Sequence, residues 1–209
     1  MKNIITLIAL FSFLIVNGQS WSQLGLDIDG EAAGDWFGSA CSFNGAGDRL
    51  AVGALYNDVN GSNSGHVKIY EFNGTSWNQM GSDINGEYTG YFFGASVSIN
   101  SAGNIVAIGA PKSYSNNSYS GYVRVYQWGG VSWSQLGADI DGEAAGDWFG
   151  NSVSMNGAGN RIVVGARLND PNGSNSGHAR VYDLVGTTWT QLDDDIDGEE
   201  ASDFFGHSV

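Results

Sequence analysis

Positive charge, cysteine and proline are all scarce in this chain of 209 residues. Only 8 lysines and arginines stand against 22 aspartates and glutamates, which gives a formal net charge of -14. Such a charge repels phosphate backbones and anionic lipid surfaces, so the composition argues against nucleic acid as a partner. The one cysteine, Cys41, cannot form an internal disulfide or build a cysteine-rich zinc site. Stability must therefore come from packing or from bound cations.

Long hydrophobic runs are also scarce, and the chain has one, Ile4 to Val16, of about thirteen residues. A membrane-spanning helix needs roughly 20 apolar residues, so no segment is predicted to insert into a membrane. The run follows a short stretch with one lysine and ends in small and polar residues, the pattern of a secretory signal peptide at 1–18. This predicts a secreted or cell-surface protein with a mature part at 19–209. The alternative is a hydrophobic first strand of the fold.

Glycine and aromatic residues are abundant instead, with 32 glycines and 12% aromatics beside only 14% charged residues. This mixture is typical of an all-β protein rich in turns. A repeat of 56 residues runs through the chain, because tryptophan recurs at a constant spacing at Trp21, Trp77, Trp133 and Trp189. Segments 21–76 and 133–188 are identical at 38 of 56 positions, which indicates duplication.

Each repeat predicts four short strands separated by turn residues. In the second repeat these strands lie at 93–100, 105–110, 122–128 and 133–140. A four-stranded unit that cannot bury both of its faces alone is typical of a β-propeller blade, since neighbouring blades pack face to face. The predicted fold is therefore a β-propeller with blades of four antiparallel strands at about 37–84, 93–140 and 149–196.

The first strand of each predicted blade carries small residues, which suit the crowded position beside a central channel. Serines occupy one side of this strand, at Ser42, Ser98 and Ser154. The other side carries Val97 and Val153 in the later repeats and Cys41 in the first. Cys41 is therefore interpreted as a small apolar core residue rather than a reactive thiol.

The two ends of the repeat region hold parts of blades. Segment 21–28 matches a fourth strand without the three before it, and 205–209 matches the opening of a first strand. Propellers usually close with 4 to 8 blades, and closure removes exposed sheet faces and edges. We therefore expect an incomplete propeller, a piece of a longer protein whose last blade pairs with 21–28 as its outer strand.

Three short motifs of the second repeat stand in a fixed order: Phe93-Gly94 opens the first strand, Gly109-Ala110-Pro111 ends the second, and Gly121-Tyr122 opens the third. This arrangement resembles the FG-GAP repeat of integrin α-subunit propellers and related bacterial proteins, and the resemblance covers essentially all of 21–209. It implies a secreted or surface propeller used for adhesion or ligand binding, with calcium in some blades. In that family the cation is held by an acidic hairpin between the first two strands. Here the hairpin 100–104 is short and neutral, so we interpret it as a plain turn.

Acidic residues gather instead in the connections between predicted blades, which hold seventeen of the 22. Like charges about 4 Å apart repel by about 1 kcal/mol even in water, so repeated clusters indicate a cation nearby. Hard oxygen ligands suit Ca²⁺. The candidate calcium ligands are Asp27, Asp29, Glu31, Asp35, Asp139, Asp141, Glu143 and Asp147. The alternative is a solvated acidic rim whose aspartates and glycines serve turn formation.

A second polar loop joins the second and third predicted strands and recurs at 57–65, 113–121 and 169–177. We expect it on the propeller face opposite the acidic connections. Loops that vary on a constant scaffold often carry specificity, which makes this a candidate ligand loop. Its candidate residues are Asn57, Asp58, Asn60, Tyr114, Tyr119, Asn169, Asp170 and Asn172. The alternative is a long surface loop without a ligand.

Motifs for catalysis do not stand out: there is no serine, histidine and aspartate set, no spaced histidine pair and no phosphate loop. His66 and His178 share one repeat position, where the second repeat has Tyr122, and are interpreted as strand-surface residues. The sequence therefore predicts a non-catalytic secreted or cell-surface module for adhesion or for binding a protein or a glycan. Two alternatives stay open, the propeller domain of a larger secreted enzyme and a structural spacer.

Overall fold

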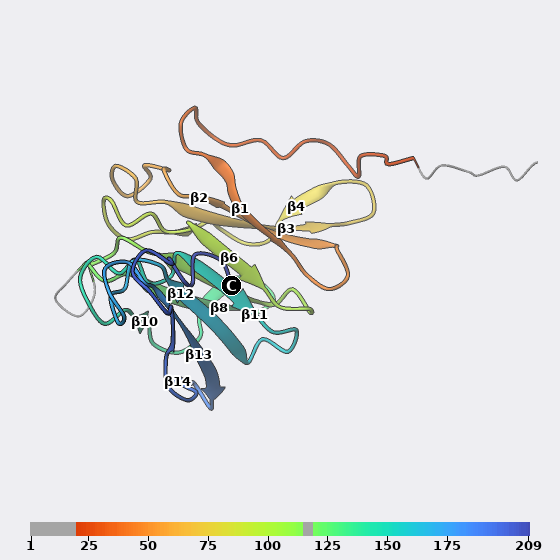
Figure 1. Cartoon of the computed structure of the whole chain (residues 1–209). Helices are drawn as coiled ribbons and strands as arrows, with labels where there is room; N and C mark the ends of the chain where they lie inside the picture. Colours follow the sequence, from red (N-terminus) through yellow and green to blue (C-terminus); the bar gives the residue numbers. More distant parts are fainter. Residues whose placement is uncertain (1–19, 115–118) are drawn as a thin grey trace, which may run out of the picture.

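The computed structural model describes residues 20–114 and 119–209, and the predicted signal peptide at 1–18 lies outside them. These residues form fifteen strands in three antiparallel sheets and no helix (Figure 1). Within the described part there is accordingly no helix that is long and apolar enough to cross a membrane. The predicted all-β fold is confirmed, and the three sheets follow one another along the chain as separate blades, not closed into a ring.

Each blade has the same antiparallel pairing: the first four strands pair in sequence order, and the short fifth strand also pairs with the third. Blade 1 consists of β1 (Phe37–Phe43), β2 (Arg49–Ala54), β3 (His66–Phe72), β4 (Trp77–Gln79) and β5 (Ile84–Asn85). Blade 2 consists of β6 (Ser96–Ile99), β7 (Ile105–Ala110), β8 (Tyr122–Trp128), β9 (Trp133–Gln135) and β10 (Ile140–Asp141). Blade 3 consists of β11 (Ser152–Met155), β12 (Arg161–Ala166), β13 (His178–Val185), β14 (Thr188–Gln191) and β15 (Ile196–Asp197).

The predicted fourth strand is interrupted in every blade. In blade 2, β9 and β10 both pair with β8, and the residues between them leave the sheet. The break contains Gly137, whose φ of 82° is incompatible with a continuing strand. Gly81 and Asp193 hold the same repeat position and also have positive φ, at 74° and 65°. The prediction of one unbroken strand at 133–140 was therefore wrong at its centre.

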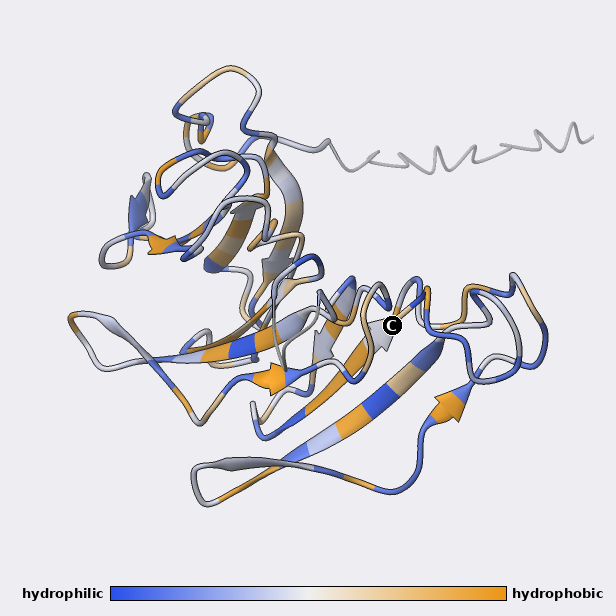
Figure 2. Cartoon of the chain, turned by 90° about the vertical axis from the view of Figure 1, so that its left-hand side faces the viewer, coloured by the Kyte–Doolittle hydropathy of each residue, from blue (hydrophilic) through white to orange (hydrophobic). Residues whose placement is uncertain are grey.

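The blades pack face to face through alternate residues of their strands. On β7, Val106 and Ile108 belong to the cluster shared with blade 1, whereas Ile105 and Ala107 belong to the cluster shared with blade 3. This is the two-residue period of a strand buried on both faces. Figure 2 shows hydrophobic and hydrophilic residues alternating along the longer strands.

The FG and GAP motifs hold neighbouring blades together. Phe93 and Phe149 are completely buried at the blade interfaces, and burying each ring stabilises the fold by about 1.5–3 kcal/mol. A Cβ atom at Gly109 would lie 2.0 Å from the carbonyl oxygen of Gly150 in the next blade. Glycine is required there because two backbones touch. The inner serines add direct links, since Ser98 Oγ accepts a hydrogen bond from the backbone N–H of Met155 at 3.0 Å.

One expectation about the N-terminal region was wrong, and a second is not tested by the described residues. Cys41 is exposed, unlike its buried counterparts Val97 and Val153, because no described blade covers that face of β1. Segment 21–28 forms no strand within the described residues, where no strand lies beside it to complete a backbone hydrogen-bond ladder. Its pairing with a further blade stays a prediction. A side-chain hydrogen bond joins the segment to blade 1, because the indole N–H of Trp77 donates to the carbonyl of Leu24 at 3.0 Å.

Candidate functional site

The acidic connections surround one buried basic residue in each blade. These residues are Lys68 on β3, Arg124 on β8 and Arg180 on β13, each at most 9% exposed. Buried cations need paired anions. Arg124 donates to Glu87 from the preceding connection at 2.7 Å and to Asp139 from the following one at 2.6 Å.

The other two blades repeat this ion-pair triad. Lys68 Nζ lies 2.5 Å from Glu31 and 3.5 Å from Asp83. Arg180 donates to Glu143 and to Asp195, and its hydrogen bond lowers the pKa of the Asp195 carboxyl. The positive charge that the acidic clusters led us to expect is therefore supplied, for the carboxylates of these triads, by basic side chains of the chain itself.

The other predicted calcium ligands hold different positions, although the amide of Asn169 joins Asp147 to Glu143 of a triad by donating to both carboxylates. Asp35 and Asp147 are buried and accept hydrogen bonds from the side-chain amides of Asn57 and Asn169, at 2.7 and 2.8 Å. Burial raises the pKa of Asp147. The remaining three lie at the rim: Asp27 accepts from Gln23, Asp29 is exposed, and Asp141 is half-buried. The structure does not bring these eight residues into one site.

The predicted ligand loops lie on the same face as the acidic connections, not on the opposite face. The amide of Asn60 donates to the carbonyl of Gly86 at 2.8 Å, and Asn172 donates to Gly198 in the same way. An antiparallel second strand ends where the first begins, so the loop after it must meet the connection that enters the first strand. The sequence-based assignment of faces was wrong for this reason.

Two of the predicted ligand-loop residues, Asp58 and Asp170, shape their own loops. Asp58 accepts from the backbone N–H of Asn63 at 2.7 Å, and Asp170 does so from Asn175 at 2.6 Å. Blade 2 differs, because the rings of Tyr114 and Tyr119 stand 5.2 Å apart in its loop, and both are about half exposed or more. These two tyrosines are the loop residues available to a ligand.

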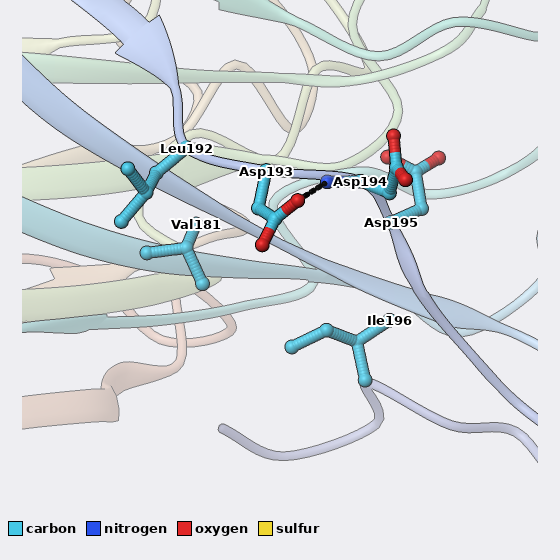
Figure 3. Close-up of a pocket in the computed structure, with 6 residues that line it drawn as sticks. All are labelled: Val181, Leu192, Asp193, Asp194, Asp195 and Ile196. Atoms are coloured by element: carbon cyan, nitrogen blue, oxygen red, sulfur yellow. Dashed lines mark hydrogen bonds between the residues drawn. The ribbon is translucent and has the colours of Figure 1, made fainter.

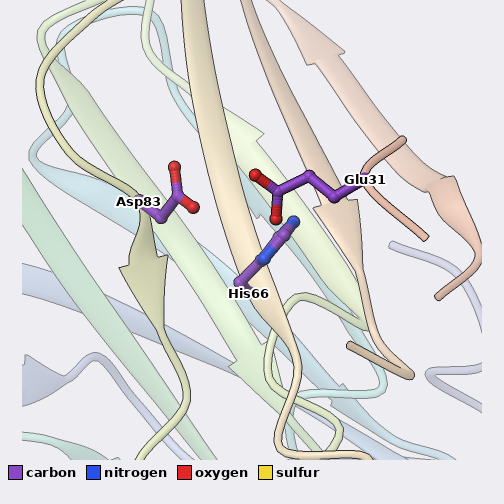
Figure 4. Close-up of side chains that lie close together, drawn as sticks. All are labelled: Glu31, His66 and Asp83. Carbon is purple, nitrogen blue, oxygen red and sulfur yellow. The ribbon is translucent and has the colours of Figure 1, made fainter. Parts of the chain in front are cut away.

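His66 and His178 are buried, which corrects their interpretation as strand-surface residues. His66 is 1% exposed, its ring nitrogens have no hydrogen-bond partner among the described residues, and burial lowers its pKa. Figure 4 shows its ring beside the carboxylates of Glu31 and Asp83, all with ligand atoms within 4.8 Å of one another. These groups could hold a metal ion, and Glu143, His178 and Asp195 repeat the set. Any ion would compete with Lys68 or Arg180 for the same carboxylates.

Sequence reasoning missed a row of aromatic rings on this face. The residue before each FG pair is aromatic and has left-handed backbone geometry, at Trp36, Phe92, Trp148 and Phe204, with φ of 55°, 58°, 59° and 52°. Positive φ is a genuine outlier for bulky residues. The ring of Tyr56 links the first two, at 4.7 Å from Trp36 and 5.3 Å from Phe92. The 56-residue spacing of these aromatics was the available signal.

Two basic side chains continue this aromatic row. The ammonium group of Lys112 lies 4.5 Å from the ring centre of Phe92 and 4.9 Å from that of Trp148. The guanidinium of Arg167 lies 4.7 Å from the Trp148 ring centre. All three distances are typical of cation–π contacts. A pocket of about 280 Å³ opens beside them, lined by Thr89, Gly90, Lys112, Tyr119, Gly146 and Trp148.

A larger pocket, of about 430 Å³, lies elsewhere, on the outer face of blade 3 beside Val181 (Figure 3). It is lined in part by Ile196, which is 49% exposed, whereas its counterparts Ile84 and Ile140 are 6% and 5% exposed. Those counterparts lie in the interfaces between blades. We therefore interpret this pocket as an uncovered blade face and not as a ligand site.

The architecture defines the class of this chain as an incomplete β-propeller. Residues 138–182 match the FG-GAP repeat family, and the repeated four-stranded sheets fit a β-propeller with FG-GAP repeats. A comparison with curated protein sequences gave no match.

Solved structures support the fold alone. A proposed 6-phosphogluconolactonase from Bacteroides uniformis is 9% identical with a TM-score of 0.52, and the match covers 78% of this chain and 41% of that one. A second proposed 6-phosphogluconolactonase, from Bacteroides fragilis, is 10% identical with a TM-score of 0.50 and coverage of 78% and 39%. The chain thus spans less than half the length of these two proteins.

Proposed function

We propose that this chain is a non-catalytic module of a secreted or cell-surface protein, and that it binds a glycan or protein through the face that carries the aromatic row. The observation that carries the proposal is the row itself. Four aromatic residues keep a backbone geometry that costs on the order of 1–3 kcal/mol each, and such strain gathers at ligand-binding sites. Partly exposed rings on repeated loops also suit recognition.

Of the two ligand classes, the pocket favours a glycan. Its volume of about 280 Å³ is at the small end of ligand pockets, which span about 300–1,000 Å³, and suits one ring-sized unit. Aromatic faces carry negative partial charge and attract the C–H groups on the flat side of a sugar ring. The neighbouring loops are rich in asparagine and serine, whose polar groups can bond hydroxyls.

Binding to an array of glycans tests this proposal, with the purified chain as the probe. We expect a defined set of glycans to bind and Trp148→Ala to abolish their binding. The matched control is Trp21→Ala, because Trp21 is 98% exposed and lies outside the row. Binding that survives Trp148→Ala would place the site elsewhere. Absence of any glycan or protein ligand would favour the structural spacer.

A further inference from the structure

Basic residues in this protein almost always face a carboxylate. Of the seven described, five form an ion pair: Arg49, Lys68, Arg124, Arg161 and Arg180. Lys112 and Arg167 have no carboxylate partner among the described residues, although the sequence has 22 acidic residues. Both unpaired cations contact the ring of Trp148.

The surroundings of Lys112 keep its charge available. No carboxylate is among the residues that line its pocket. The ring contacts stabilise the ammonium group by about 0.5–1 kcal/mol each at an exposed site, which is less than a charge-assisted hydrogen bond of about 1.5–3 kcal/mol. An anion entering the pocket would therefore find a fixed and unneutralised positive group.

Arg167 supplies a second donor on the same ring. One of its terminal nitrogens lies 3.4 Å from the ring nitrogen Nδ1 of His207, and its Nε is buried without a partner among the described residues. A planar guanidinium held against an aromatic ring presents its remaining N–H groups in a fixed direction, which suits the planar geometry of a carboxylate.

We propose that Lys112, Trp148 and Arg167 bind an anionic saccharide, which rests on the proposed binding function of this face. The sugar ring packs on Trp148, and its carboxylate or sulfate accepts hydrogen bonds from Lys112 and Arg167. A saccharide polymer is favoured over an acidic peptide because ring platforms recur at equivalent positions of successive blades, at Phe92 and Trp148 among them, and a polymer of rings offers matching units.

Calorimetric titration with four probes tests this inference. The probes are a galacturonic acid hexamer, its fully methyl-esterified form, a heparin hexasaccharide and a glutamate hexamer. We expect at least one acidic saccharide to bind at least tenfold more tightly than the esterified hexamer, with affinity that falls as salt is added. The galacturonate and heparin arms separate carboxylate from sulfate recognition.

Matched variants assign the binding to these side chains. Lys112→Met with Arg167→Met should weaken binding of the acidic saccharide at least tenfold, whereas Lys112→Arg alone should retain it because the positive charge is kept. Arg161→Met is the control, because it removes one positive charge from an exposed pair with Asp183 away from the row. Melting curves check that each variant is folded.

Three results would overturn the inference. Absence of binding to both acidic saccharides is the first, and equal binding of the glutamate hexamer is the second. The third is equal binding of the esterified hexamer that depends on Trp148 but not on Lys112 or Arg167. In that third case the proposed glycan-binding function stands, and only the preference for an anion fails.

Discussion

One aromatic residue in each repeat combines an unfavourable backbone with a ring that takes part in the row. A left-handed conformation costs roughly 1–2 kcal/mol for a residue with a Cβ atom and almost nothing for glycine. Glycine would therefore suit positions 36, 92, 148 and 204 better if only the turn mattered. Stability of the turn alone therefore does not explain the aromatic residues at these positions, and their rings are expected to have a role in binding.

Two substitutions of Trp148 measure this strain. Trp148→Ala and Trp148→Gly both remove the ring, but only alanine keeps the penalty at a φ of 59°. We expect the glycine variant to be more stable than the alanine variant by about 1 kcal/mol. Urea unfolding of the two variants checks it, and an alanine variant of equal or greater stability would show that the backbone there is not strained.

Buried histidine at positions 66 and 178 predicts loss of stability in weak acid. Burial is the main cause that lowers the pKa of both rings. Lys68 and Arg180 lower the pKa further, while the nearby carboxylates raise it, and these effects are smaller. The unfolded chain takes up protons near pH 6.5, while the folded chain does not. The unfolded state then binds more protons, so the free energy of unfolding falls as pH drops below about 6.5.

The second blade offers the control for this effect, because Tyr122 fills the same position. We expect the chain to melt at a lower temperature at pH 5.5 than at pH 7.5. The double variant His66→Tyr with His178→Tyr should lose most of that difference. The histidines are not responsible if the double variant keeps the full pH dependence while it stays folded.

At the scale of elements, the third strand of each blade and the two connections beside it form one electrostatic unit. Arg124 is 8% exposed, while Glu87 and Asp139 remain partly in contact with water. Removing the guanidinium leaves two neighbouring carboxylates without a cation. Hydrogen bonds to charged groups contribute about 1.5–3 kcal/mol, so Arg124→Met should destabilise the chain by about that amount.

Calcium addition distinguishes this ion-pair interpretation from the predicted calcium site. We expect the melting temperature of the unchanged chain to be the same in millimolar calcium and in a chelator, because Arg124 already forms ion pairs with Glu87 and Asp139. Arg124→Met should instead gain stability from calcium, since a divalent ion can replace the guanidinium. A calcium-dependent rise in the unchanged chain would support the sequence-based calcium assignment.

Gly109, next to the end of β7, makes one of the tightest backbone contacts between neighbouring blades. A methyl group at Gly109 would lie 2.0 Å from the Gly150 carbonyl oxygen, and neither backbone can move aside easily. Gly109→Ala should therefore destabilise the chain by at least about 2 kcal/mol. Gly129→Ala is the control, because its nearest atom would be 3.6 Å away. Equal melting temperatures of the two variants would contradict this account.

The sequence predicted the blades better than the site. A constant 56-residue period places strands correctly, since each strand needs only local alternation and turn residues. The break at Gly137 was readable as a glycine inside a strand pattern. The role of Arg124 was not, because its partners Glu87 and Asp139 come from connections far apart in sequence. The contact of Lys112 with two rings likewise exists only once blades are packed.

On the scale of the whole molecule, equivalent residues have different surroundings in successive blades. Ile84 and Ile140 are buried by the following blade, whereas Ile196 is half exposed on the outer face of blade 3. Phe43 on the opposite outer face, in β1, is 55% exposed. Apolar sheet faces left open in this way attract other apolar surfaces.

Ile140 in blade 2 and Ile196 in blade 3 hold equivalent positions but should contribute differently to stability. Ile140→Ala should lower the free energy of unfolding by about 2–5 kcal/mol, because it leaves a cavity between packed blades. Ile196→Ala should change it by less than about 1 kcal/mol and should reduce binding of a hydrophobic dye to the outer face of blade 3. Both variants are measured by urea unfolding at low protein concentration, where association is weakest. If Ile196→Ala is as damaging as Ile140→Ala, and more so as the concentration rises, then a second copy of the chain covers that face in solution.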